Sequence, residues 1–181
     1  KAGSPTVALL SSNPTLYFTA DTGLIRADGT QQQVLDERFS TENGDRQFTL
    51  APGVATLSVP LTWVDAASGL TVRRTLSLDR GSYVLGVQEQ VSNAGASAQQ
   101  LYPYVALDRV APPAPPKHSF MTSPETFSFI GAAWYTPEEK YEKATLADFE
   151  DVLPPSSDVK GGWIAMLQHH FVTAWVPLED Q

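Results

Sequence analysis

The sequence predicts an all-β, mainly antiparallel protein with minor short helices. Fourteen prolines and twelve glycines separate short runs of Val, Leu, Thr, Tyr and Phe, which is typical of antiparallel β proteins. Apolar and polar residues alternate from Thr56 to Trp63 with the period of a half-buried strand. The longest apolar run, Lys160 to Pro177, is rich in β-branched and aromatic residues, which favour strand over helix. We expect the rest of the chain to pack around this run.

The N-terminal part of the chain predicts one clear strand and much loop. The strand is expected over Leu16–Ala20, and turn signals follow at Asp21–Gly23 and Ala27–Gly29. The polar stretch Thr30–Asp45 is expected to be a surface loop. A second short strand is expected over Gln47–Leu50.

The middle of the chain predicts an antiparallel meander of four strands with one solvated face. Pro60 lies inside the first strand and indicates a sheet edge or a bulge, because proline cannot donate a backbone hydrogen bond. Arg74 falls on the apolar side of the second strand and breaks its alternation. The four strands are expected over Thr56–Trp63, Leu70–Leu78, Tyr83–Val91 and Gln99–Leu107.

The second half combines strand signals with helix-start signals. A strand is expected over Phe127–Tyr135. Thr136, followed by Pro137 and by Glu139 three residues on, has the pattern of a capping box and predicts a helix start or a turn. In the run Lys160–Pro177, the polar interruption at Gln168–His170 indicates a bulge or a break.

Composition sets limits on the function. The chain has 181 residues, which predicts one domain or at most a tight pair, with a substantial core. Its formal charge of −8 argues against a nucleic-acid partner or anionic lipid, because either would need a basic patch. The absence of cysteine excludes disulfides, thiolate metal sites and cysteine catalysis. No apolar run reaches the roughly 18–20 residues that span a bilayer.

No pattern of catalytic or cofactor-binding residues is present. The sequence lacks nucleotide-binding glycine loops, the nucleophile-elbow motif and the paired-histidine zinc motif. We therefore predict no catalytic residue, no metal ligand and no cofactor. The acidic stretch that begins at Glu138 is expected to be a solvated face, because lysines are interleaved in it. The tryptophans are expected to lie mainly in the core.

Two stretches of the second half carry a family resemblance. They are Gly131–Lys143 (GAAWYTPEEKYEK) and Lys160–Pro177 (KGGWIAMLQHHFVTAWVP), and Leu9–Pro14 and Val91–Gly95 fit the same family in order. These stretches resemble the large periplasmic domain of the YidC-type membrane-protein insertases of bacteria. The resemblance covers nearly the whole chain, from about Leu9 to Pro177.

The resemblance implies a fold, a location and partners. The fold would be a β-supersandwich with galactose mutarotase-like architecture. Residues 1–181 would form a single periplasmic domain, truncated at both ends, with a proline-rich connector at 111–116 inside it. The parent would be a bacterial inner-membrane insertase, and its insertion chemistry would be carried by membrane helices outside this soluble domain. Partners would be proteins, namely SecDF, SecYEG and nascent membrane proteins.

Three hypotheses of function follow, with different candidate residues. In the first, the chain is a non-catalytic protein-interaction domain, and its partner-binding residues are Pro112, Pro113, Pro115, Pro116, Glu138, Glu139, Glu142 and Asp148. In the second, it is a carbohydrate-binding or mutarotase-like module that uses Trp134, Glu142 and His170. In the third, it is a structural spacer.

Overall fold

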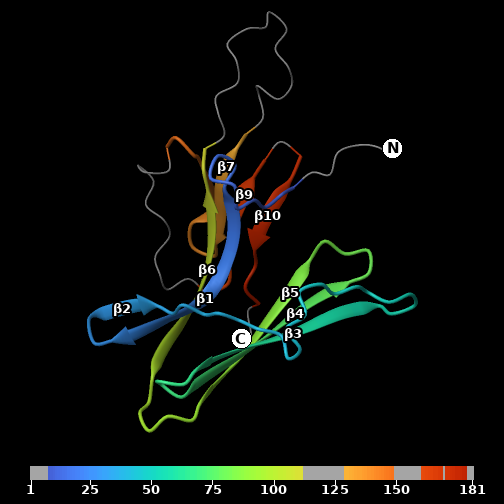
Figure 1. Cartoon of the computed structure of the whole chain (residues 1–181). Helices are drawn as coiled ribbons and strands as arrows, with labels where there is room; N and C mark the ends of the chain where they lie inside the picture. The colour runs from blue at the N-terminus through green and yellow to red at the C-terminus, as the bar shows by residue number, and fades with distance from the viewer. Residues whose placement is uncertain (1–7, 112–128, 149–159, 169, 179–181) are drawn as a thin grey trace, which may run out of the picture. The chain divides into compact units, whose positions relative to one another are not determined.

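Three antiparallel β-sheets make up the computed structural model, which describes residues 8–111, 129–148, 160–168 and 170–178 (Figure 1). One sheet has the order β2-β1-β6, a second the order β3-β4-β5, and a third the order β10-β9-β7-β8. The strands are β1 (Phe18–Asp28), β2 (Gln31–Val34), β3 (Thr56–Asp65), β4 (Leu70–Asp79), β5 (Leu85–Asn93), β6 (Gln100–Arg109), β7 (Gly131–Thr136), β8 (Lys140–Thr145), β9 (Trp163–Leu167) and β10 (Val172–Trp175). The prediction of a mainly antiparallel all-β fold is confirmed.

The described residues contain no helix, so the predicted minor short helices are not found there. Thr136 does act as a cap, because its Oγ1 accepts a hydrogen bond of 2.8 Å from the backbone N–H of Glu139. The capped segment is a turn, however, since Thr136 pairs with Lys140 as β7 continues into β8. Lys140 closes this turn with a left-handed φ of 66°. The capping signal therefore marks a β-hairpin, and a helix interpretation of it is wrong.

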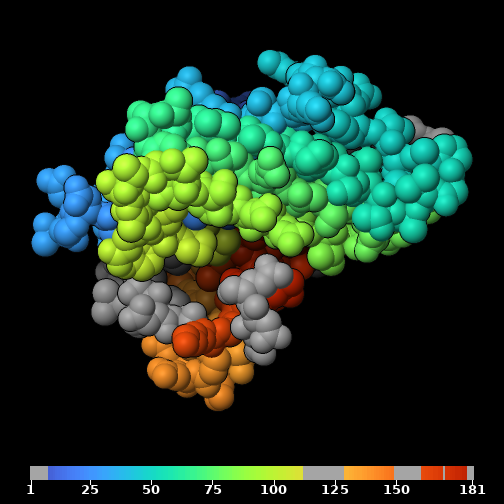
Figure 2. Space-filling model, turned by 90° about the horizontal axis from the view of Figure 1, so that it is seen from below, coloured from blue at the N-terminus to red at the C-terminus, as the bar shows by residue number. Residues whose placement is uncertain are grey.

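The chain divides into two compact units, and each has its own apolar cluster. The first unit comprises residues 1–22 and 104–181, and the second comprises residues 23–103. In the space-filling view, the cyan-to-green residues of the second unit form one continuous body (Figure 2). β1 and β6 each contribute residues to both units.

The second unit is built around a cluster of aliphatic side chains from β1, β4 and the segment after β2. Leu70 and Val72 of β4 have no exposed surface at all. Leu24 and Leu35 complete the buried cluster, and the half-buried residues that pack on it are Phe39, Trp63 and Leu101. The alternation of β4 therefore places its apolar face inward, as the period of two predicts.

The turn between β3 and β4 is closed by side-chain hydrogen bonds and a close backbone approach. The Asp65 carboxylate accepts hydrogen bonds from Ser68 Oγ and from Arg26 of β1. These bonds, with the Ser68 bond as the main cause, lower the pKa of Asp65. Gly69 has a φ of 78°, and a Cβ there would lie 2.5 Å from the backbone nitrogen of Gly95. Only glycine fits this position without displacing the chain after β5.

The first unit contains the four-stranded sheet, whose buried face is lined by small residues around one tryptophan. Ala132, Trp134 and Ala144 form its cluster, and Ile164 packs against them. Trp175 of β10 lies opposite Ile164 and donates a hydrogen bond of 3.1 Å from Nε1 to the carbonyl of Ala106 on β6. The small side chains leave room for the indole ring of Trp134, which is 7% exposed.

Several sequence predictions are corrected by strand pairing. The fourth predicted meander strand, β6, lies in the sheet of β1, so the meander has three strands. The polar stretch predicted as loop includes β2, because its backbone pairs with β1 from Ile25↔Val34 to Asp28↔Gln31. β1 also continues through the turn predicted at 21–23, and residues 47–50 form no strand. Backbone pairing overrides side-chain composition in these segments.

The run 160–177 is two strands and not one. β9 and β10 form a hairpin that turns at the predicted interruption, where the backbone N–H of Gln168 donates to the carbonyl of Phe171. Trp175 lies opposite Ile164, so Trp163 and Trp175 are on opposite faces of the sheet. An unbroken strand would have placed both on one face, because they are an even number of residues apart, but the run breaks at the predicted interruption. With two separate clusters, this run is also not the element around which everything else packs.

The edge predicted from Pro60 is confirmed, because β3 pairs only with β4 within its sheet. Ser40 meets the outer side of β3 through two backbone hydrogen bonds with Thr62, of 3.0 and 2.9 Å. Within the described residues, no helix is long and apolar enough to cross a bilayer.

The Leu70 side chain supports the second unit, so L70A should lower the free energy of unfolding by about 2–5 kcal/mol. The truncation would leave a cavity between Leu24 and Val72. Denaturant titration followed by tryptophan fluorescence measures this, with L85A as the matched control, because Leu85 is 53% exposed. L85A should cost less than about 1 kcal/mol. Equal losses would contradict the assigned core.

Candidate functional site

A concave surface of the second unit lies on the polar face of the β3-β4-β5 sheet. Strand register places Thr62, Arg73 and Gln90 in one cross-strand row. Pro60, Thr75 and Gln88 form the next row on the same face. Because residues two apart on a strand share a face, the two rows form a continuous polar floor.

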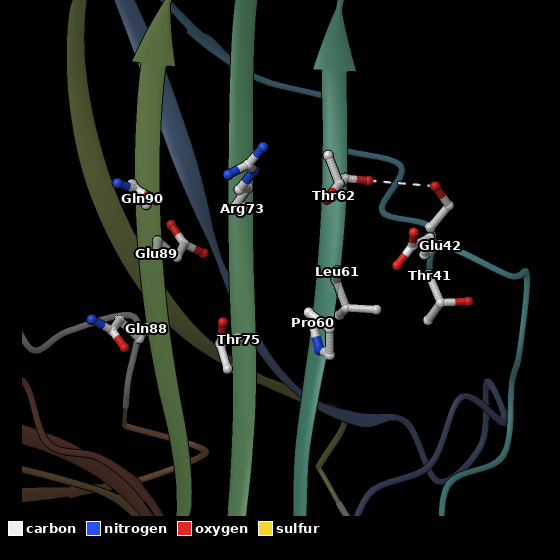
Figure 3. Close-up of a pocket in the computed structure, with 11 residues that line it drawn as sticks. Thr41, Glu42, Pro60, Leu61, Thr62, Arg73, Thr75, Gln88, Glu89 and Gln90 are labelled. Carbon is white, nitrogen blue, oxygen red and sulfur yellow. Dashed lines mark hydrogen bonds between the residues drawn. The ribbon is translucent and has the colours of Figure 1, made fainter.

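A cavity of about 830 Å³ lies over this floor (Figure 3). Its volume is in the range of small-molecule and peptide-segment sites. Figure 3 shows Gln90, Arg73 and Thr62 side by side across the three strands, with Thr41 and Glu42 beyond β3. The segment 40–42 forms the wall of the cavity on the β3 side. Beside Pro60 and Leu61, the groups that line it are amides, hydroxyls, a guanidinium and the Glu42 carboxylate, which suit the binding of a polar ligand.

The wall is fixed to the floor. The two backbone bonds between Ser40 and Thr62 hold the start of the segment. Thr41 Oγ1 donates a hydrogen bond of 2.9 Å to the carbonyl of Asp45, which closes the loop. The cavity is therefore bounded by preorganised backbone, which reduces the entropy cost of binding.

The opposite face of the same sheet carries a buried ionic triad. Arg74 lies 3.1 Å from Glu37 and also donates from Nε to Glu89 of β5. The side chains of Arg74 and Glu37 are 13% and 4% exposed. The guanidinium stands 4.1 Å from the centre of the Phe39 ring. This triad explains why Arg74 interrupts the apolar alternation: its charge is neutralised by two carboxylates and covered by an aromatic ring.

Glu37 is the most buried side chain of the triad. Burial raises the pKa of Glu37, Arg74 opposes this rise, and the negative charge of Glu89 adds to it. Glu37 Oε1 is buried and has no hydrogen-bond partner among the described residues. The carboxyl group is therefore held in a place that disfavours its ionised form.

The predicted acidic partner-binding residues lie on or near the β7–β8 hairpin of the first unit. Glu138 and Glu139 are exposed in its turn, and Glu142 is exposed on β8. Asp148 is exposed after β8 and accepts a hydrogen bond from Thr145 Oγ1. The structure thus groups three glutamates on one hairpin. The predicted proline residues, Pro112, Pro113, Pro115 and Pro116, lie outside the described residues.

The residues proposed for carbohydrate binding are only partly brought together. Trp134 and Glu142 are cross-strand partners on β7 and β8. Trp134 is buried, however, so its ring offers no open face to a sugar. His170 lies in the turn that follows Leu167, and Leu167 pairs with Gly131 of β7. Gly131 is three residues before Trp134, which is roughly 10 Å along the strand. The three side chains therefore do not line one cleft.

The structure shows two features that the sequence interpretation missed. The first is an aromatic cluster of Tyr135 on β7, Tyr141 on β8 and Trp163 on β9. The ring centre of Trp163 is 6.4 Å from that of Tyr135 and 6.0 Å from that of Tyr141. The polar floor of the cavity was also missed, although the alternation of Thr and Gln residues along the strands was a usable signal. Within the described part of the chain, no group of three metal-ligating side chains occurs.

Comparisons with known proteins point to one family. A family model described as the YidC periplasmic domain matches residues 1–181. A protein of Stenotrophomonas maltophilia (strain K279a) named "Membrane protein insertase YidC" is 38% identical over 179 residues, which is 99% of this chain and 31% of that protein. A protein of the same name from Xanthomonas euvesicatoria pv. vesicatoria (strain 85-10) is 36% identical over 181 residues, covering 100% and 30%. The chain spans just under a third of the length of these curated relatives.

The raised pKa of Glu37 predicts a specific pH dependence of stability. The folded state binds the Glu37 proton more tightly than the unfolded chain, whose reference pKa is 4.5. The contribution of Glu37 is therefore most favourable below pH 4.5 and is lost as the pH rises through the folded pKa. Denaturant titrations between pH 4.5 and 7 should show wild type losing stability relative to E37Q. A difference that grows in favour of wild type with rising pH would contradict the assignment.

Proposed function

Because the chain belongs to the family of YidC periplasmic domains, we propose that it is a non-catalytic protein-interaction domain of a bacterial inner-membrane insertase. In this proposal the domain lies on the periplasmic side of the membrane. It contacts the translocon subunits SecDF and SecYEG and nascent membrane proteins. Insertion itself is assigned to the remainder of the parent protein.

The observation that carries the proposal is the extent of the family match. The match covers residues 1–181, and the relatives named as insertases align over 99% or more of the chain. A membrane-protein insertase handles protein chains, so protein partners are the natural class for its periplasmic domain. The composition agrees with this class, because a net charge of −8 disfavours nucleic acid and anionic lipid.

The β7–β8 hairpin supplies the contact surface in this proposal. Glu138, Glu139 and Glu142 are exposed, and the neighbouring Lys140 and Lys143 belong to β8. Exposed charges of this kind steer partners and set specificity at the rim of an interface. β8 is the last strand of its sheet among the described residues, and its exposed charges discourage uncontrolled strand pairing there. The hairpin therefore favours contact with a partner through its side chains over backbone pairing with a partner strand.

Charge reversal on the hairpin tests the partner surface. In the full-length parent protein, E138K/E139K/E142K should lower co-purification with SecDF by about tenfold. Three rim charges at roughly 0.5 kcal/mol each give about 1.5 kcal/mol. The measurement is the amount of SecDF recovered per insertase under fixed salt.

The control is D28K/D45K/D108K, which makes the same charge change at three other exposed carboxylates. This variant should retain SecDF as wild type does. Unchanged recovery with the hairpin variant would remove the hairpin from the proposal. Equal losses in both variants would show that net charge, and not this surface, controls association.

A further inference from the structure

We propose that the cavity on the β3-β4-β5 sheet binds a carboxylate carried by an extended polypeptide segment, with Arg73 as its receptor. This inference names the chemistry of one partner segment and so rests on the proposed role in protein interaction. It concerns a surface in the second unit, whereas the acidic hairpin belongs to the first. The two surfaces can therefore be tested separately.

Arg73 is the centre of the site. It is exposed on the middle strand of the sheet, between Thr62 on β3 and Gln90 on β5. Its guanidinium has no ion-pair or hydrogen-bond partner within the described residues. The next residue, Arg74, points to the other face and is held by two carboxylates. Of this adjacent pair, Arg73 is thus the cation that remains available to a ligand, and its planar fork matches a carboxylate.

The flanking side chains complete the receptor. Gln90 lies beside Arg73, and Gln88 lies two residues away on the same face of β5. Their amides can donate to a ligand oxygen and accept from a ligand N–H. Thr62 and Thr75 offer hydroxyl groups from β3 and β4. Groups that both donate and accept match the alternating N–H and C=O groups of an extended backbone.

The lining favours a polypeptide over a sugar. No aromatic residue lines the cavity, so the site lacks the flat apolar surface on which a sugar ring would stack. The cluster of Tyr135, Tyr141 and Trp163 belongs to the first unit. The cavity volume of about 830 Å³ accommodates several residues of a peptide.

The wall adds selectivity. Glu42 is exposed on the fixed segment beyond β3 and has no recorded partner within the described residues. Glu89 is also at the cavity, but its side chain belongs to the opposite face of the sheet, where its charge is paired with Arg74. Glu42 therefore places one uncompensated negative charge at the rim, which disfavours a second ligand carboxylate near the first. The geometry suits a segment with a single acidic residue among neutral polar ones.

The test uses the 181-residue chain and two synthetic dodecapeptides. Both consist of Ser, Thr and Gln, and they differ only at one central residue, which is Glu in one and Gln in the other. Peptide binding is followed by the NMR signals of the side-chain amides of Gln88 and Gln90. The Glu peptide should shift these signals saturably and bind about tenfold or more tightly than the Gln peptide, because a charge-assisted hydrogen bond is lost in the latter.

Two variants and a control assign the effect to Arg73. R73Q should abolish the preference for the Glu peptide, and E42Q should leave it intact or strengthen it. R38Q is the control, because Arg38 is an exposed arginine of the same unit that pairs with Asp36 and does not line the cavity. R38Q should bind like wild type. Folding of each variant is checked by its unfolding midpoint.

Several outcomes would overturn the inference. These are equal affinity for the two peptides, an equal effect of R38Q and R73Q, or shifts confined to residues outside the cavity. Saturable shifts with a hexose or an acidic disaccharide but not with the Glu peptide would reassign the site to sugars. If R73Q loses the preference for the Glu peptide but SecDF recovery stays normal, the cavity inference is supported independently of the hairpin surface. Failure of the peptide test with a positive hairpin test would refute only the cavity inference.

Discussion

The buried contact of Arg74 with Glu37 and Glu89 is the constraint on which much of the second unit depends. It joins the middle strand of the β3-β4-β5 sheet to β5 and to the segment that follows β2. That segment continues through Phe39, which covers the guanidinium, to Ser40, which pairs with β3. The contacts of Arg74 thus help to position the segment from Glu37 to Ser40, which crosses the apolar face and reaches the edge of the sheet. Breaking such a buried pair on one side leaves an uncompensated charge, which is costly.

Each face of this sheet carries one arginine, and the two arginines have different roles. Arg74 is paired and largely buried, and it joins neighbouring segments of the unit. Arg73 is exposed beside amides and hydroxyls, and it faces the cavity. The period of two along a strand converts neighbours in sequence into residues with different roles. The functional surface and the structural core of the unit are therefore separated by a single backbone layer.

The sequence was sufficient to predict the β class and the strands with clear alternation, because that alternation directly reports burial on one face. It was not sufficient where pairing depends on distant segments. β2 consists of three glutamines and one valine, all exposed, and it is a strand because its backbone pairs with β1. β6 continues the alternating pattern of the meander yet pairs with β1. The turn between β9 and β10 was visible as a polar interruption, but its effect on the faces of Trp163 and Trp175 follows only from the register.

The candidate sites show the same division. The family resemblance in the hairpin sequence was strong enough to predict the class of protein, since its motifs are long and unusual. The exposure of Glu138, Glu139 and Glu142 also followed from their pattern with lysines. The cavity was not predicted, because its floor combines three strands and its wall comes from a segment before them. The alternation of a strand shows which residues share a face, but it does not show which strands will lie beside it.

The contact of Ser40 with the outer side of β3 has a consequence for self-association. Pro60 supplies no N–H on this strand, and both backbone groups of Thr62 are already used by Ser40. A second copy of the chain would find these successive docking points closed, and could not extend the sheet across them. This border of the sheet is therefore protected against extension by a second copy of the chain at the positions that Pro60 and Ser40 occupy.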